Sequence, residues 1–184
     1  NPPELTRALA MTHIALHDAA NAVRPKYERY AYHVTEDTGA DPSAAAAVAA
    51  AEVLKHRRPA KAAAIDALLA VDLAMVSNPQ RLQNSINVGQ AAAAAIIALR
   101  ANDGSTSAAT PYTPGTEPGD YQPTAANAFV LFPGWGNVTP FAMAAANQFL
   151  GNGPNALTSA EYTADYNEVK DYGSATSTAR TDEQ

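Results

Sequence analysis

The sequence contains no cysteine and only four histidines, and these shortages limit the chemistry that it can perform. Without cysteine the chain forms no disulfide and no thiolate metal site, although this absence does not indicate a cellular compartment. The sequence also has no Gly-x-Ser-x-Gly element and no phosphate-binding glycine loop of the Walker or dinucleotide type. Nowhere do the charged residues, 16% of the chain, assemble the groups that a reaction needs. We therefore predict no catalytic and no cofactor-binding residue among the 184 residues.

Positive charge and long apolar runs are also scarce. The formal net charge is −6, so the chain as a whole does not attract phosphate backbones, and we expect no nucleic-acid partner. No apolar run approaches the roughly 20 residues that cross a bilayer, so we expect no membrane span. No signal peptide is visible at Asn1, and any targeting segment is expected to have been removed or never present. The cellular location stays open, and a periplasmic or secreted protein fits these observations.

Alanine is abundant, and it favours helices that approach one another closely. The composition therefore predicts an all-α fold, a bundle of about six helices in a single domain. Prolines and side-chain caps mark the helix starts, as in Asp41-Pro42-Ser43 and Ser77-Asn78-Pro79. In the first helix the apolar residues Leu5, Leu9 and Leu16 occur among many alanines, which predicts burial on more than one side. The four helices predicted within residues 1–103 span about residues 2–23, 42–56, 59–73 and 79–101.

Residues 104–139 differ in composition from the helical region, because they contain five prolines and five glycines. This composition predicts a long irregular loop. Since the loop also carries several aromatic side chains, we expect it to wrap around and pack against a surface. The aromatic residues are Tyr112, Tyr121, Phe129, Phe132 and Trp135.

The sequence of residues 140–184 predicts two shorter helices and the start of a further one. Thr139-Pro140 begins the first of them, which runs to about Phe149. Thr158 and Glu161 have the spacing of a capping box, and the helix that they begin ends at about Gly173. Residues 181–184 have the composition of the first turn of another helix.

His13 and His17 lie four residues apart in the first predicted helix, so their rings share one helix face, and Asp18 follows directly. Two helical histidines with this spacing bind zinc in metalloproteases, but there a glutamate follows the first histidine, where this chain has Ile14. A zinc site would also need a further ligand from elsewhere in the chain. We favour a packed or interfacial pair, and His13, His17 and Asp18 remain the candidate metal ligands.

The dense basic segment Lys55-His56-Arg57-Arg58, with Lys61 nearby, is a second candidate site because such a cluster can bind an anion. The segment also lies at the C-terminus of the second predicted helix, where cations complement the helix dipole. We favour this structural role over anion binding.

Several stretches stand out by their order and spacing along the chain. They are residues 7–22, Arg100-Ala101-Asn102-Asp103-Gly104, Tyr112-Thr113-Pro114-Gly115, Pro118-Gly119-Asp120-Tyr121-Gln122-Pro123-Thr124, Pro133-Gly134-Trp135-Gly136, Val138-Thr139-Pro140-Phe141 and Asn167-Glu168-Val169-Lys170. Together they resemble the bacterial vanadium-dependent haloperoxidase-like proteins of the phosphatidic acid phosphatase type 2 superfamily. The resemblance covers nearly all of the chain.

The resemblance implies a mostly α-helical bundle whose active site holds vanadate or phosphate through a lysine, two arginines, a serine–glycine pair and two histidines. Such an oxyanion needs converging cationic and N–H donors. The family's site consists of a lysine six residues before Arg-Pro, then Pro-Ser-Gly-His, then Ser-Arg with a later histidine, and none of these blocks occurs here. No catalytic residue is therefore carried over, and the catalytic part is expected after residue 184.

The resemblance thus implies that the chain is the N-terminal, non-catalytic part of a vanadium-dependent haloperoxidase or acid phosphatase-like protein. Alone it would be inactive, and it would pack against the missing C-terminal catalytic half, with a homodimer as a further option. Vanadate, or phosphate as substrate, would belong to the intact parent, whose choice between the two activities stays open. The alternatives are a stand-alone helical binding or scaffold module, and a metal-binding module built on His13 and His17.

Overall fold

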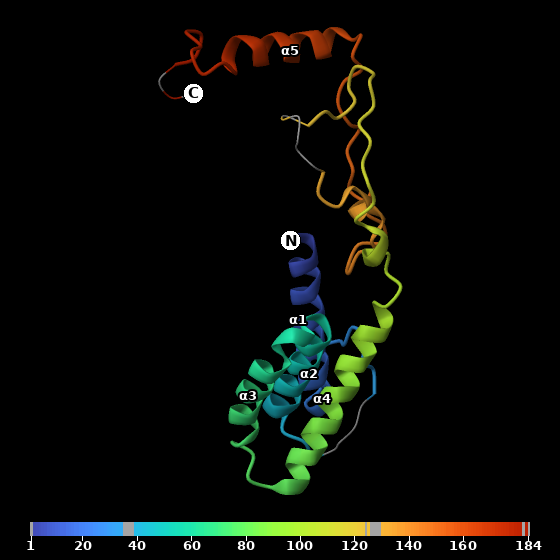
Figure 1. The fold of residues 1–184 in the computed structure, drawn as a ribbon, viewed down its shortest axis with the longest axis vertical. Helices are drawn as coiled ribbons and strands as arrows, with labels where there is room; N and C mark the ends of the chain where they lie inside the picture. Colours follow the sequence, from blue (N-terminus) through green and yellow to red (C-terminus); the bar gives the residue numbers. More distant parts are fainter. Residues whose placement is uncertain (1, 35–38, 124, 126–129, 182, 184) are drawn as a thin grey trace. The chain divides into compact units, whose positions relative to one another are not determined.

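The structure is a computed structural model that describes residues 2–34, 39–123, 125, 130–181 and 183. Within these residues it contains five α-helices and no β-strand, so the predicted all-α class is confirmed, with one helix fewer than expected (Figure 1). The chain divides into two compact units, Asn1–Ala108 and Ala109–Gln184, where the sequence predicted a single domain. The helices are α1 (Pro2–Val23), α2 (Pro42–Arg57), α3 (Ala62–Leu73), α4 (Pro79–Leu99) and α5 (Ala160–Tyr172).

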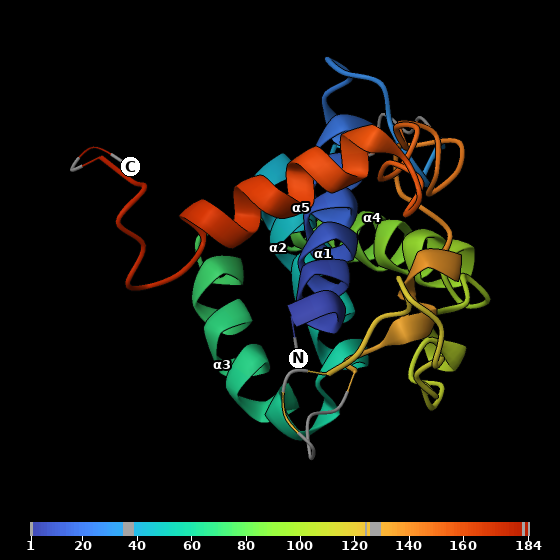
Figure 2. The same cartoon turned by 90° about the horizontal axis from the view of Figure 1, so that it is seen from above.

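The first unit contains α1 to α4, with α2 at its centre. α2 packs against α1, α3 and α4, and α1 also packs against α4. Figures 1 and 2 show α1, α2 and α4 gathered together, with α3 on the outer side of α2. No helix in the described part of the chain combines the length and apolarity that a membrane crossing needs.

The helices of the first unit begin close to where prolines and side-chain caps predict. The Asp41 carboxylate accepts hydrogen bonds from two backbone N–H groups in the first turn of α2. The Asn78 side chain accepts one from the N–H of Arg81 in α4. Pro59 begins a short 3-10 turn, Pro59–Lys61, that leads into α3. After α4, Gly104 adopts a left-handed conformation with φ of 88°, which glycine reaches without the steric cost of a Cβ atom.

The interior of the first unit is made mainly of alanine, so its helices approach closely. At Gly89 the backbone of α4 lies close against α2. A Cβ atom there would lie 2.5 Å from the Cβ of Val48 and 2.6 Å from the carbonyl oxygen of Ala45. Small side chains let α2 and α4 come this close. Because protein interiors are close-packed, a larger side chain at Gly89 has no room. The buried alanines of α2 are Ala44, Ala45, Ala46, Ala49 and Ala51.

The large apolar side chains of the first unit lie mostly on its surface. The prediction that α1 is buried on more than one side is wrong, because Leu5 and Leu9 are each about half exposed. The buried face of α1 instead holds small and polar residues such as Ala15 and Asp18. α3 buries no residue, and its Leu68 is 72% exposed. Since alanines already fill the space between the helices, most of the leucines stay outside it.

The second unit buries almost none of its residues. Among its described residues Val138 alone is buried, and α5 buries none. The described residues of the segment 104–139 are irregular, as predicted, apart from a 3-10 turn at Ser105–Ser107 in the first unit and another at Pro133–Asn137 in the second. Thr124 and Phe129 of this segment lie outside the described residues. Without a buried core, the second unit has little apolar burial to stabilise it by itself.

The helix predicted over residues 140–149 is absent, so that prediction is wrong. Residues 141–149 form turns and bends, and nearly all of them are exposed. A helix there would be only about ten residues long, and isolated helices shorter than about 12–15 residues are marginal in water. The segment buries too few side chains to offset this cost, so the helix-start residues Thr139 and Pro140 do not produce a helix.

The last helix begins one residue later than predicted. Its N-cap is Ser159, whose hydroxyl accepts a hydrogen bond from the N–H of Tyr162 at 3.0 Å. Thr158 and Glu161 therefore form no capping box, because two neighbouring hydroxyl residues compete for the same role and Ser159 takes it. The further helix predicted at residues 181–184 falls largely outside the described residues.

Substitution Gly89→Ala tests the close approach of α2 and α4. Alanine improves helix propensity by about 1 kcal/mol, but overpacking of a filled core costs about 1–3 kcal/mol. We expect a net loss of about 1 kcal/mol or more in the free energy of unfolding, measured by urea denaturation. Gln90→Ala, at an exposed position of the same helix, is the control and should leave stability within about 0.5 kcal/mol. A Gly89→Ala variant as stable as the wild type would contradict the packing described.

Candidate functional site

Two polar clusters occupy the buried face of α1, one near each end. The first contains Arg7 and the second contains Asp18 and Asn21, and all three residues are buried. Residues at spacings of three and four share one face of a helix, so the same stripe that carries Met11 and Ala15 into the interior also carries these polar groups. Each cluster ties α1 to a segment that follows a helix.

In the first cluster Arg7 joins α1 to the end of α4. Its Nε donates to Oδ2 of Asp103 at 2.7 Å, and its Nη2 donates to the carbonyl oxygen of Arg100 at 2.7 Å. The Arg100 guanidinium also donates to Oδ2 of Asp103, with Nη2 at 2.8 Å. Oδ1 of Asp103 accepts the N–H of Ser105 at 3.1 Å. Buried charges require such partners, so this cluster locks the turn after α4 onto α1.

These hydrogen bonds determine the pKa of Asp103. Burial raises the pKa, but the hydrogen bonds from Arg7 and Ser105 outweigh it and lower the pKa to about 2. The carboxylate is therefore charged throughout the neutral range and acts as a structural acceptor. It has neither the pKa nor the exposure of a general base at neutral pH.

In the second cluster Asp18 and Asn21 hold the loop that follows α1. Asp18, which is fully buried, accepts the N–H of Tyr30 on Oδ1 at 2.8 Å and those of Ala31 and Tyr32 on Oδ2 at 2.7 and 2.9 Å. Oδ1 of Asn21 accepts two more backbone N–H groups, those of residues 26 and 27. The backbone N–H groups of the loop have no helix or sheet partner, and these two side chains supply their acceptors.

The structure does not bring His13, His17 and Asp18 together as metal ligands. Both oxygens of Asp18 accept backbone N–H groups, and His13 is exposed. Nε2 of His17 donates to the carbonyl oxygen of Glu28 at 2.9 Å. Among the residues that the structure describes, no three His, Cys, Asp or Glu side chains form a group that could hold a metal ion. The packed interpretation of His17 therefore has the better support.

The basic segment at the end of α2 divides into residues with different roles. Lys55 forms ion pairs with Glu52 at 3.0 Å and with Asp66 of α3 at 2.9 Å, which links α2 to α3. Arg57 is partly buried, and burial is the main cause that lowers its pKa, followed by the positive charge of Arg7. The segment is therefore no uniform solvent-exposed patch.

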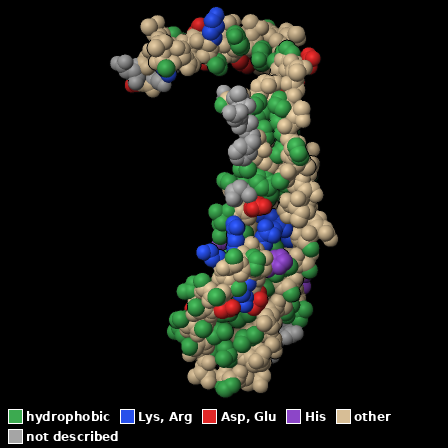
Figure 3. Space-filling model, in the orientation of Figure 1, with side chains coloured by type: hydrophobic (Ala, Val, Ile, Leu, Met, Phe, Trp, Pro, Cys, Tyr) green, Lys and Arg blue, Asp and Glu red, His purple; other side chains and the backbone are tan. Residues whose placement is uncertain are grey.

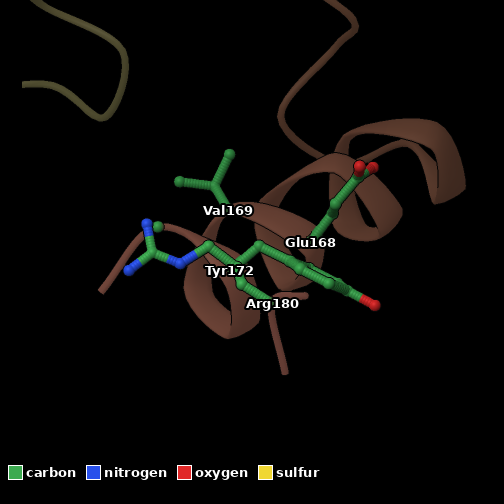
Figure 4. Close-up of a pocket in the computed structure, with 5 residues that line it drawn as sticks. Glu168, Val169, Tyr172 and Arg180 are labelled. Atoms are coloured by element: carbon green, nitrogen blue, oxygen red, sulfur yellow. The ribbon is translucent and has the colours of Figure 1, made fainter. Parts of the chain in front are cut away.

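Open hollows lie on the described surface of both units. In the first unit a hollow of about 530 Å³ is lined by Leu16 of α1, the alanines of α2 and the leucines of α3, so it is apolar. Figure 3 shows hydrophobic side chains over much of the visible surface of this unit. In the second unit a hollow of about 570 Å³ lies beside α5, lined by residues that include Glu168, Tyr172 and Arg180. Figure 4 shows the polar ends of these three side chains pointing apart, so no catalytic group converges there.

No protein-family model matches the chain, and no curated protein or solved structure matches it either. What the chain does must therefore be inferred from its residues and their geometry.

Sequence reasoning missed Asn21 and the joint role of Arg7 and Asp103. The sequence contains signals for both features, but they are weak. Asp18 and Asn21 stand three apart in the last turns of a helix that Pro25 ends, a place where side chains often bond to the following loop. Arg7 interrupts the apolar stripe of α1, and a charge in such a stripe needs a partner from another segment, here about 96 residues away.

The pH dependence of stability tests the Asp103 cluster. The folded pKa of about 2 lies below the unfolded value, so the stabilisation is complete above about pH 4 and is lost as the pH falls towards 2. It amounts to about 2–3 kcal/mol at neutral pH. We expect urea denaturation to show Asp103→Asn less stable than the wild type at pH 7, with the difference shrinking between pH 5 and pH 2. A difference that stays constant over this range would contradict the low pKa.

A second substitution separates the structural role of Asp18 from metal binding. Asp18→Ala leaves three backbone N–H groups without their acceptor, each worth about 1 kcal/mol or more, so we expect a loss of about 3 kcal/mol in the free energy of unfolding. The exposed carboxylate variant Asp72→Ala is the control and should stay within about 0.5 kcal/mol of the wild type. Adding zinc should leave the Tm of the wild type unchanged. A zinc-dependent rise in Tm that His13→Ala abolishes would restore the metal interpretation.

Proposed function

We propose that this chain is the non-catalytic helical part of a vanadium-dependent haloperoxidase-like or acid phosphatase-like protein of the phosphatidic acid phosphatase type 2 superfamily. In this proposal it packs against the catalytic helical bundle, supports it and shapes access to it. The single observation that carries the proposal is that many large apolar side chains of the first unit lie on its surface. Alanines make up most of the interior of the first unit, where Met11 and Ile96 are the largest buried side chains, and its leucines lie at least partly exposed.

The outer surface of α3 is the clearest docking surface. Leu68 and Val71 lie three residues apart on α3, and Met75 follows in the turn after the helix. Their exposed fractions are 72%, 66% and 84%. Apolar patches of this kind on a soluble protein mark sites of interaction. A helical partner that lies along these side chains would bury them.

The second unit also supports a partner that covers exposed apolar side chains. With Val138 as its one buried described residue, it lacks a core, yet it exposes apolar side chains such as Phe149, Leu150 and Val169. Segments of this kind become ordered when a partner covers them. The catalytic bundle is the partner that the resemblance implies.

The polar residues within the resembling stretches support a scaffold role. Arg7, Arg100 and Asp103 join α1 to the end of α4, and Asp18 and Asn21 hold a loop. All of these contacts are structural. The groups that bind vanadate or phosphate would come from the catalytic part.

The proposal predicts an inactive chain with an adhesive surface. Purified 1–184 should neither oxidise bromide with vanadate and peroxide nor cleave a phosphate ester. It should enhance the fluorescence of an apolar dye. The triple substitution Leu68→Gln, Val71→Gln and Met75→Gln should lower that signal by at least about half, because it removes three highly exposed large apolar side chains of the first unit. The control Ala63→Gln, Ala67→Gln and Ala70→Gln introduces the same residue at exposed alanines of α3 and should keep most of the signal.

Several results would contradict this proposal. One is bromide oxidation or phosphate-ester cleavage by homogeneous 1–184. Another is a monomer that binds no dye, which would favour a stand-alone module. The coding sequence that follows codon 184 gives an independent check, because the proposal requires it to encode the lysine, Arg-Pro, Pro-Ser-Gly-His and Ser-Arg blocks.

A further inference from the structure

Asn152 and Gly153 form the one Asn-Gly pair in the sequence, and they lie in the irregular segment that precedes α5 (Figure 1). Residues 150–158 are all exposed. Within the described part of the chain, no hydrogen bond holds the side chain of Asn152 or the backbone N–H of Gly153. Exposed segments without such contacts sample many backbone conformations, so this pair is not confined to one of them.

Gly153 makes its own backbone nitrogen accessible to the side chain of Asn152. Its φ is 76°, a left-handed conformation that glycine adopts at little cost. A Cβ atom on Gly153 would meet no heavy atom of the described residues within 4 Å, so the space around the pair is open. Because glycine has no side chain, nothing on residue 153 hinders the approach of the Asn152 Cγ atom to this nitrogen.

The one Asp-Gly pair of the sequence, Asp103-Gly104, has the opposite surroundings. Asp103 is buried, its Oδ2 accepts hydrogen bonds from Arg7 and Arg100, and its Oδ1 accepts one from the N–H of Ser105. These bonds hold the carboxylate in one position. Its pKa of about 2 keeps it ionised at neutral pH, and an ionised carboxylate resists attack by a nucleophile.

We propose that Asn152 is a site of spontaneous deamidation, at which the chain modifies itself, and that the fold protects Asp103 from the equivalent reaction. The backbone nitrogen of Gly153 loses its proton to water and bonds to Cγ of Asn152. The bond from Cγ to the side-chain nitrogen breaks, and that nitrogen takes up a proton from water and leaves as ammonia. The product is a cyclic succinimide.

Water then opens the succinimide. Its oxygen bonds to one of the ring's carbonyl carbons, and the bond from that carbon to the Gly153 nitrogen breaks, so this nitrogen regains its proton. Opening at the side-chain carbonyl leaves aspartate at position 152, and opening at the backbone carbonyl leaves isoaspartate, whose main chain is longer by a methylene group.

The complete reaction consumes water, releases ammonia and transfers no electron. Each product adds a negative charge to a chain whose formal net charge is already −6. The proposal concerns a segment of the second unit by itself, and it does not depend on the function proposed for the chain.

Peptide mass spectrometry of the 1–184 chain, incubated at mildly alkaline pH, tests the site. We expect Asn152 to react at least about tenfold faster than Asn147, an exposed asparagine of the same unit that a glutamine follows. Gly153→Ala should slow the reaction at Asn152 by at least about tenfold, because a Cβ atom hinders the attack. Gly151→Ala, which changes the glycine on the other side of Asn152, is the control and should leave the rate unchanged. Equal rates at Asn152 and Asn147, or equal rates in the wild type and Gly153→Ala, would overturn the proposal.

Urea separates the effect of the fold from that of the sequence. The rate at Asn152 should change by less than about threefold on unfolding, because the native segment is already open. At mildly acidic pH, Asp103 should form isoaspartate in urea, where its carboxyl group is partly protonated, but not in the folded chain. An Asn152 that reacts much faster in urea would show that the native structure holds the pair, and isoaspartate at Asp103 in the folded chain would show that the cluster gives no protection. Either result would contradict the proposal.

Discussion

The close approach of α2 to its neighbours determines most other features of the first unit. Gly89 has no room for a Cβ atom, and alanines line the surfaces between the helices. Packing of this kind buries little apolar area per residue, since alanine contributes little compared with leucine. The larger apolar side chains lie outside as a consequence, and the surface of α3 is the plainest example. A helical unit built in this way leaves many of its large apolar side chains at the surface.

Where apolar burial is limited, polar clusters hold the ends of the helices. Arg7, Arg100 and Asp103 fasten the turn after α4, and Asp18 with Asn21 fastens the loop after α1. These contacts join segments far apart in the sequence, and each is buried, so breaking one leaves charged or polar groups unpaired.

Local signals predicted the class and most helix starts of the first unit, because prolines and capping side chains act within a few residues of where they stand. Asp41 and Asn78 cap helices as expected. Burial was less predictable. The leucines of α1 have helical spacing but lie on its outer surface, since the alanines across the interface decide which side packs. The helix expected at residues 140–149 does not form, because so short a helix is marginal without burial and the local start signal does not show whether burial is available.

Hydrogen exchange of the isolated 1–184 chain tests the central claim most directly, namely that the first unit has its own core and the second does not. The amides of α1, α2 and α4 should be strongly protected, because global unfolding of the first unit limits their exchange. The amides of α5 and of the described residues between 109 and 159 should exchange nearly as fast as those of an unfolded peptide. Protection of α5 comparable to that of α2 in a monomeric sample would contradict the account, because it would show that the second unit is stable without a partner.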